Sequence, residues 1–297
     1  MKKILVLAAA AFAFCMQLAS QSSFFDNYVY QQWTSFGGLS GTTATDIAQT
    51  SDGFINIGTY EGLVRFDGVA FSTMRRSKDN GLTFASVRVV VEDSSGNLWI
   101  GSNDEGVQLL QPDLNMTFTT QNGLPNNSIR AIVEDKDKNV WVGTAGGVVY
   151  MSKSRHLFNP QFEAGTVSKG VISTQLICDR DGRVWLTTEN DKGLFVFKDG
   201  LFRTIPSMDK FGDYAVTDVC QDRDGNFWVG TDNSGLVKIV NGEAIAVHTG
   251  TILDSIPVTA IFQAQDGNVW FGTESGLVVS ARENSMSVTR QKFRMLR

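Results

Sequence analysis

Histidine, cysteine and proline are scarce in this sequence. Its 297 residues include 2 histidines, 3 cysteines and 5 prolines, against 29 glycines. Neither His156 nor His248 has a cysteine or serine nucleophile beside it in the sequence, so no coherent catalytic set emerges from them. Many glycines with few prolines indicate numerous tight turns, which is typical of an all-β protein.

The sequence also lacks a strong excess of charge of either sign. The net charge is −5, and one short cluster near the C-terminus is basic: Arg290, Lys292, Arg294 and Arg297. A nucleic-acid-binding protein normally presents a basic face, so we expect no nucleic-acid partner. Beyond the N-terminus no apolar run approaches the length of a membrane-spanning helix, so we expect no membrane span in the mature chain.

The N-terminus has the pattern of an export signal. Lys2 and Lys3 precede an apolar stretch from residue 4 to residue 13, and small residues offer a cleavage site around Ala19. Residues 1–20 are therefore predicted to be a signal peptide, and residues 21–297 a single domain in the periplasm or outside the cell. A lipid anchor on Cys15 is the alternative, but Phe14 stands where a small residue is usually needed.

Cleavage would leave Cys178 and Cys220 in the mature chain. They lie four and five residues before the turn glycines of their repeats, which places them on opposite faces of equivalent strands. We therefore expect no disulfide between them and interpret Cys220 as a small apolar core residue.

An internal repeat of 42 to 44 residues covers nearly all of the predicted mature chain. A turn glycine recurs at Gly53, Gly96, Gly182, Gly225 and Gly267, with Lys138 in its place in the third copy. Three residues further on stand Trp99, Trp141, Trp185, Trp228 and Trp270, with Asn56 in the first copy. The repeats run roughly over 38–80, 81–122, 123–168, 169–211, 212–254 and 255–297.

Each repeat contains four short segments with strand character, separated by turn residues. A sheet of this size cannot bury both of its faces alone, whereas such sheets stacked around an axis can, so the pattern predicts a β-propeller of four-stranded antiparallel blades. The tryptophans are predicted to fill the space between blades. The glycines that open the third strands, such as Gly106, are predicted to have positive φ.

Six repeats predict six blades, or an incomplete ring of seven. The last blade needs a fourth strand, which Tyr28–Trp33, Met286–Arg290 or Lys292–Leu296 could supply.

The segment GLPNNSIRAIVEDKDKNVWVGTAGGVVY, Gly123–Tyr150, resembles the two-component regulator propeller repeat. The resemblance extends over residues 38–279. It implies a periplasmic ligand-sensing propeller of the kind that feeds histidine kinases, hybrid kinases or diguanylate cyclases. No such output domain follows the repeats in this sequence. We therefore expect an exported, non-enzymatic, ligand-binding sensor propeller without its own output domain.

The loops between the second and third strands of the repeats are rich in acidic and amide side chains. In the propeller geometry they share one rim with the starts of the inner strands, so they are candidate ligand contacts: Glu61, Asn103, Asp104, Glu105, Glu189, Asn190, Asp191, Asp232, Asn233 and Glu274. Solvation of surface loops is the alternative reading of the same residues.

Two arginines interrupt a threonine series eight residues before the turn position. Arg88 and Arg130 stand where the other repeats have Thr45, Thr174, Thr217 and Thr259. They are candidates for binding a carboxylate or sulfate near the channel mouth. The alternative is that they form structural ion pairs with Asp46 or the rim acids, and a bulge in the strand would turn them away from the channel.

Three other functions have weaker support. The Asp-x-Asp-Gly turns at Asp179 and Asp222 have asparagine at the twelfth position, where an EF-hand loop needs glutamate, so neither a metal nor a cofactor is predicted. A lyase using a histidine, and a protein-interaction scaffold in the cell envelope, are the alternatives to ligand sensing. The expected partner is a small molecule, a glycan or an envelope protein.

Overall fold

The computed structural model of the protein describes residues 43–77, 81–111, 114–166, 170–189, 193–211, 215–232, 235–247, 253, 256–280 and 286–287. The predicted signal peptide, the predicted strand Tyr28–Trp33, His248 and the basic C-terminal cluster lie outside these residues. So do Asn190, Asp191 and Asn233 among the predicted rim residues.

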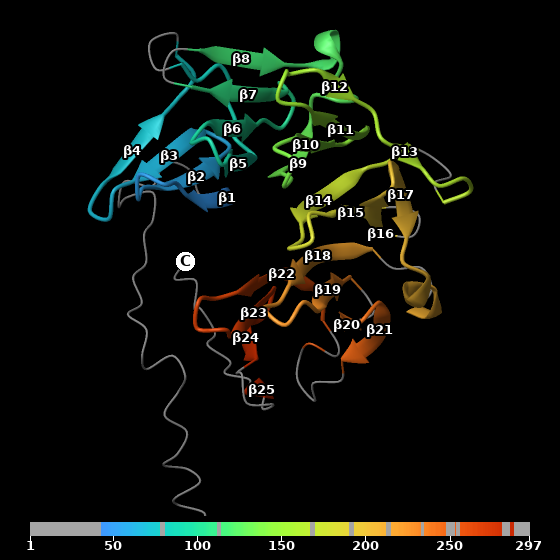
Figure 1. Cartoon of the computed structure of the whole chain (residues 1–297). Helices are drawn as coiled ribbons and strands as arrows, with labels where there is room; N and C mark the ends of the chain where they lie inside the picture. Colours follow the sequence, from blue (N-terminus) through green and yellow to red (C-terminus); the bar gives the residue numbers. More distant parts are fainter. Residues whose placement is uncertain are drawn as a thin grey trace, which may run out of the picture.

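Six antiparallel sheets follow one another along the chain (Figure 1). Blade 1 contains β1 (Ala44–Gln49), β2 (Ile55–Thr59), β3 (Gly62–Phe66) and β4 (Phe71–Met74). Blade 2 contains β5 (Val89–Glu92), β6 (Leu98–Gly101), β7 (Val107–Leu110) and β8 (Asn115–Phe118). Blade 3 contains β9 (Ile129–Glu134), β10 (Val140–Thr144), β11 (Gly147–Met151) and β12 (Leu157–Phe158).

The second half of the chain repeats this order. Blade 4 contains β14 (Ser173–Cys178), β15 (Val184–Thr188), β16 (Leu194–Lys198) and β17 (Leu201–Thr204), and the short strand β13 (Gln161–Phe162) pairs in parallel with β17. Blade 5 contains β18 (Val216–Gln221), β19 (Phe227–Thr231), β20 (Leu236–Val240) and β21 (Glu243–Val247). Blade 6 contains β22 (Val258–Gln263), β23 (Val269–Thr273), β24 (Gly276–Ser280) and β25 (Met286–Ser287). Two short 3-10 helices, η3 (Thr120–Asn122) and η4 (Pro206–Phe211), follow β8 and β17.

The first strand of every blade faces a common centre, and the fourth strand lies outermost except in blade 4, where β13 is added outside β17 (Figure 1). The predicted β-propeller with six four-stranded blades is therefore confirmed. The outermost strand of blade 6 is β25, which begins at Met286 and pairs with β24, so one of the C-terminal segments considered for this place does occupy it.

The repeated tryptophans lie between neighbouring blades. Trp99, Trp141, Trp185 and Trp228 are buried, and each belongs to a hydrophobic cluster that includes inner-strand residues of the following blade. Trp270 in blade 6 is half-buried. The indoles thus join one blade to the next, because neither face of a single sheet is otherwise covered.

Each buried indole is held by the aspartate that opens the preceding turn. The indole Nε1 donates to the carboxylate Oδ2 in four blades: Trp99 to Asp93 at 2.9 Å, Trp141 to Asp135 at 2.7 Å, Trp185 to Asp179 at 2.8 Å and Trp228 to Asp222 at 3.0 Å. In blade 1 both partners are exchanged, and the Asn56 Nδ2 donates to the Thr50 Oγ1 at 2.9 Å. The carboxylates also accept backbone amides of their own turns, so turn and tryptophan form one unit.

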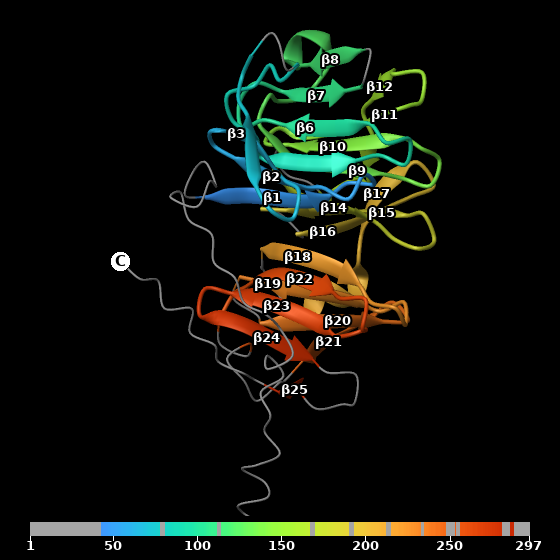
Figure 2. The same ribbon diagram turned by 90° about the vertical axis from the view of Figure 1, so that its left-hand side faces the viewer.

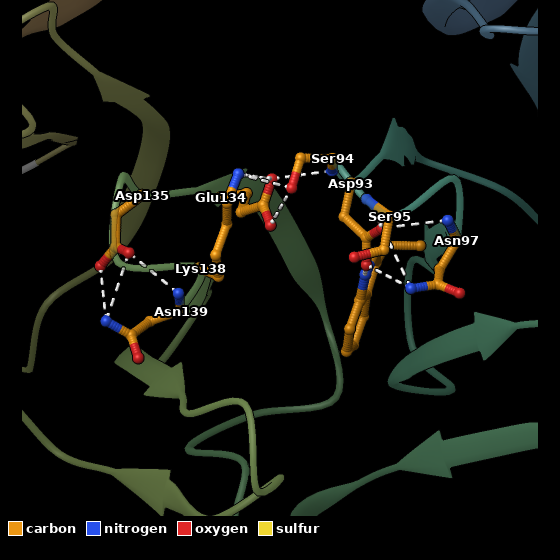
Figure 3. A network of polar contacts seen from close by, with 9 residues as sticks. Asp93, Ser94, Ser95, Asn97, Glu134, Asp135, Lys138 and Asn139 are labelled. Carbon is orange, nitrogen blue, oxygen red and sulfur yellow. Dashed lines mark hydrogen bonds and ion pairs between the residues drawn. The ribbon is translucent and has the colours of Figure 1, made fainter.

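A polar clamp joins consecutive blades at the rim formed by these turns. Figure 3 shows it between blades 2 and 3, where the Ser94 amide and hydroxyl donate to the two carboxylate oxygens of Glu134 at 2.8 and 2.9 Å. Lys138 Nζ donates to the same hydroxyl at 2.6 Å. Ser51 and Glu92 repeat the arrangement between blades 1 and 2.

The glycine of the Trp-x-Gly motif allows the next blade to approach closely. A Cβ on Gly101 would lie 2.5 Å from the Ile129 Cγ2 of blade 3, and one on Gly143 would lie 2.8 Å from the Ser173 Cβ of blade 4. Glycine is required at the start of the third strands because of the backbone conformation there. Gly106 has φ 98°, and positive φ recurs at all six equivalent positions, as predicted.

Replacing Gly101 by alanine should lower the free energy of unfolding by about 1–3 kcal/mol, because the added methyl group forces blades 2 and 3 apart. Denaturant unfolding of the purified protein would measure the change. Gly170→Ala is the matched control, since no atom lies within 4 Å of its added Cβ. Equal effects of the two substitutions would contradict close packing at Gly101.

Candidate functional site

A cavity of about 440 Å³ lies at the centre of the propeller, against the inner strands of blades 1 to 4. Its lining combines apolar strand residues with a few polar groups: Thr45, Asp46, Ile47, Arg88, Val89, Val90, Val91, Arg130, Ala131, Ile132, Gln175 and Leu176. Both predicted arginines are among them, and none of the predicted rim acids is.

A bulge near the start of the inner strands determines where the threonine series points. The strand register shifts around Thr45, Thr174, Thr217 and Thr259. The Thr45 Oγ1 donates to the Val87 backbone oxygen of blade 2 at 2.7 Å, and Thr217 bonds in the same way to Val258 of blade 6. These threonines therefore bridge consecutive inner strands.

Arg88 and Arg130 occupy the bridging position in blades 2 and 3 but line the cavity. Arg88 stands just before β5, and Arg130 lies at the register shift of β9. The Arg88 Nη1 donates to the Asn103 Oδ1 at 3.0 Å. The Nε of Arg130 is buried and has no hydrogen-bond partner among the described residues. One of the two arginines that line the cavity therefore has a buried donor that the described part of the protein leaves unused.

The electrostatics of the pair indicate that the two arginines lie close together. Burial, and next the positive charge of Arg130, hold the pKa of Arg88 below its usual value. Electrostatic interactions with Tyr60 and Glu189 act in the opposite direction. Two neighbouring cations in a partly buried cavity favour an anion between them.

The acidic residue in the cavity lining, Asp46, stabilises the backbone of two neighbouring inner strands. The Asp46 carboxylate accepts the backbone amides of Ile47 and of Val90 in blade 2, both at 2.8 Å, and burial raises its pKa. It therefore does not form the ion pair with an arginine that was one of the expectations.

Polar side chains at the position of Asp46, seven residues before the turn glycine, also accept backbone amides in blades 4 and 5. The Gln175 Oε1 accepts the Val219 amide at 2.9 Å, and Asp218 accepts the amides of Val219 and Ile261. Burial raises the pKa of Asp218 to about 6, against the hydrogen bonds that lower it. Sequence reasoning missed the function of these residues, because the polar side chain seven places before the turn glycine is absent from half of the repeats.

The predicted rim residues divide into two groups. Glu105 and Asp232 hold loop backbone, since Glu105 accepts the Ala85 amide at 2.9 Å and Asp232 accepts the Ala215 amide at 3.0 Å. Glu61 lies 3.6 Å from Arg75 in an exposed ion pair. The others that the structure describes are exposed: Asn103, Asp104, Glu189 and Glu274. Among the rim residues that the structure describes, Asn103 and Glu189 interact with Arg88.

A second cavity, of about 490 Å³, lies between blades 2 and 3 near the clamp shown in Figure 3. Its polar groups are bonded to one another: Glu134 to Ser94, Asn97 to Asp93, and the Arg155 Nη2 to the Gln111 Oε1 at 2.7 Å. The central cavity is the better candidate, because two arginines line it and one of them has a donor without a partner among the described residues.

Several predicted features lie away from this centre. His156 is exposed at the turn before β12, with its Nδ1 3.0 Å from the Ser154 Oγ. Cys178 and Cys220 are free, and burial raises the pKa of both thiols. The carboxylate of Asp179 is occupied by its own turn and by Trp185, which leaves the calcium interpretation without support. In the described ranges, no helix has the length and apolarity needed to cross a membrane.

Four segments of the chain match the family model described as two component regulator propeller: residues 81–104, 123–146, 210–233 and 252–275. These segments fall in repeats 2, 3, 5 and 6. No curated protein matches the chain in sequence.

Solved structures with the same fold include the extracellular domains of two hybrid two-component systems from B. thetaiotaomicron. BT3049 is 21% identical with a TM-score of 0.72, over 88% of this chain and 36% of that one. BT4673 is 18% identical with a TM-score of 0.64, over 85% and 34%. The chain thus spans about a third of the length of these proteins. A virginiamycin B lyase from Staphylococcus aureus is 14% identical with a TM-score of 0.65, over 84% of each chain. At these identities the likenesses show the fold.

Proposed function

Because the chain carries repeats of the two-component regulator propeller, we propose that it is an exported sensor-type propeller that binds a small anionic ligand in its central cavity. The protein releases its ligand unchanged. The observation that carries the proposal is the pair Arg88 and Arg130 in the lining of that cavity, with the buried Nε of Arg130 lacking a partner among the described residues.

The chemistry of the pair selects the ligand class. A buried donor without a partner costs about 1–3 kcal/mol, more when it is charged, so a ligand toward which the Arg130 guanidinium turns this donor gains that energy. Guanidinium groups bind planar carboxylates and sulfates through two parallel hydrogen bonds. The neighbouring Tyr60, Asn103 and Glu189 offer further polar contacts toward Arg88. A carboxylated or sulfated sugar fits this combination of one anionic group with several hydroxyls.

Two observations support export and sensing. The N-terminal twenty residues have the signal-peptide pattern, and the B. thetaiotaomicron propellers of the same fold are extracellular domains of two-component systems.

Calorimetric titration of the protein with a panel of uronic acids and sulfated sugars tests the proposal. We expect a saturable ligand whose affinity falls at least tenfold in Arg130→Ala and in Arg88→Ala, because each substitution removes a charge-assisted contact. Higher salt should weaken binding to the wild type as well. Arg75→Ala is the matched control, since Arg75 lies outside the cavity lining and is largely exposed.

Two results would contradict the proposal. Binding of an anionic sugar with unchanged affinity in both cavity variants would place the site elsewhere. Turnover of a bound sugar, lost in His156→Ala, would favour the lyase alternative.

A further inference from the structure

Two exposed apolar side chains mark the ends of the arc of blades. Ile47 on β1 and Phe262 on β22 are each 66% exposed, although both lie on inner strands. Figure 1 shows a wider interval between blade 6 and blade 1 than between any other two neighbours. Figure 2, seen from this side, shows β1–β3 and β22–β24 standing apart.

In the other blades, the residues equivalent to Ile47 and Phe262 are covered by a neighbouring blade. Residues at the position of Ile47 are buried against the preceding blade: Val90, Ile132, Leu176, Val219 and Ile261. Residues at the position of Phe262 pack against the following blade: Ala48, Val91, Val133, Ile177 and Cys220. Ile47 and Phe262 therefore lie on faces suited to a further layer between blades 6 and 1.

A glutamine four residues before the turn glycine also indicates a missing neighbour before blade 1. Gln221 and Gln263 each donate to the carbonyl of their own turn glycine and accept the amide of a turn residue in the preceding blade. Gln49 occupies this position in blade 1 and makes the first contact, to the Gly53 oxygen at 3.4 Å. For its Oε1 the described residues supply no amide donor. The layer before blade 1 should therefore offer backbone amides.

The sequence repeat identifies the segment that belongs there. β25 already fills the outermost place of blade 6, so Tyr28–Trp33 is not needed for that sheet. In register with the repeats, Leu39 matches Leu82, Leu124 and Leu253, which are all buried just before an inner strand. The chain between residues 21 and 42 is rich in aromatic side chains: Phe24, Phe25, Tyr28, Tyr30, Trp33 and Phe36.

We propose that residues 21–42 of this chain cover the two open faces, with Leu39 beside Ile47 and the segment Tyr28–Trp33, predicted from the sequence to be a strand, reaching Phe262. Length permits this. Packed sheets lie about 10 Å apart, so one missing layer leaves roughly 20 Å to cross. Twenty-two residues span at most roughly 70 Å when extended, enough to cross the interval and return. The inference is independent of the proposed ligand.

Thiol labelling of the full chain tests the proposal. Phe262→Cys should react at least tenfold more slowly than Ile245→Cys with a water-soluble maleimide, although Ile245 on β21 is less exposed in the structure, at 51%. The unsubstituted chain gives the background of Cys178 and Cys220. Replacing Tyr28, Tyr30 and Trp33 together by serine should restore fast labelling of Phe262→Cys and leave Ile245→Cys unchanged. Circular dichroism verifies that each variant is folded.

Two outcomes would overturn the proposal. Labelling of Phe262→Cys as fast as that of Ile245→Cys, in protein that is monomeric by light scattering, would show that nothing covers the face. Slow labelling that persists after the triple serine substitution and speeds up on dilution would assign the cover to a second copy of the chain.

Discussion

Replacing Trp141 by alanine is expected to lower the free energy of unfolding by about 3–5 kcal/mol, the range for truncating a large buried aromatic side chain. Trp141 is 2% exposed and lies between blades 3 and 4. Its ring packs on Tyr150 at 4.6 Å and on Phe197 at 4.7 Å between centroids. Removing it leaves a cavity at a blade junction and takes one hydrogen bond from the buried Asp135, which keeps its bonds to Asn139.

Denaturant unfolding followed by far-UV circular dichroism measures this change. The variant Trp141→Phe separates the contribution of apolar packing from that of the hydrogen bond to Asp135. Phenylalanine keeps most of the apolar volume but cannot donate to Asp135, so about 1–3 kcal/mol should be lost. Phe158→Ala is the control: Phe158 stacks on Tyr150 but is 44% exposed on the short outer strand β12. If Trp141→Ala cost no more than Phe158→Ala, the indoles would not hold the blades together.

The stability of the protein is expected to fall as the pH rises from about 4 to above 6, because of Asp218. Burial raises the pKa of this carboxyl from 3.8 to about 6 in the folded protein. Between these values the folded state binds a proton that the unfolded state has released, so raising the pH disfavours folding. The shift corresponds to a loss of up to about 3 kcal/mol once Asp218 is ionised.

Unfolding free energies of wild type and Asp218→Asn, measured between pH 4.5 and 7.5 at constant ionic strength, check this expectation. The variant should lose most of the slope. A smaller slope of the same sign should remain, since burial also raises the pKa of Asp46. The turn aspartates Asp93, Asp179 and Asp222 have lowered pKa values, so their stabilisation is lost at pH values below this window. Asp104→Asn, on an exposed loop, should keep the wild-type slope. An unchanged slope in Asp218→Asn would contradict the assignment.

The architecture could be predicted from the sequence because a propeller repeats its local chemistry. The register of five tryptophans and the glycines before the third strands determine the strand order and the faces of each sheet. The pairing of four of the indoles with a turn aspartate was missed. A turn explains an aspartate by itself, and only the folded hairpin brings the two residues, six positions apart, within 3 Å.

The candidate site was predictable in part. Arg88 and Arg130 can be recognised in the sequence because the other repeats have threonine at this position, and both arginines line the central cavity. The inner-strand bulge turns the threonines toward the next blade, which strand alternation does not predict. The predicted rim acids do not all face solvent, since some of them accept backbone amides of the loops. Whether a carboxylate such as Glu105 faces solvent or holds a backbone amide depends on loop conformation, which composition does not determine.

The short parallel strand β13 has a consequence for association between molecules. The outermost strand of a sheet presents unpaired backbone groups onto which another chain can add a strand. In blade 4, β13 hydrogen-bonds along Leu201 and Phe202 of β17 and withdraws those groups. β13 then forms the edge of the sheet itself, and an edge strand of two residues offers another chain little to pair with.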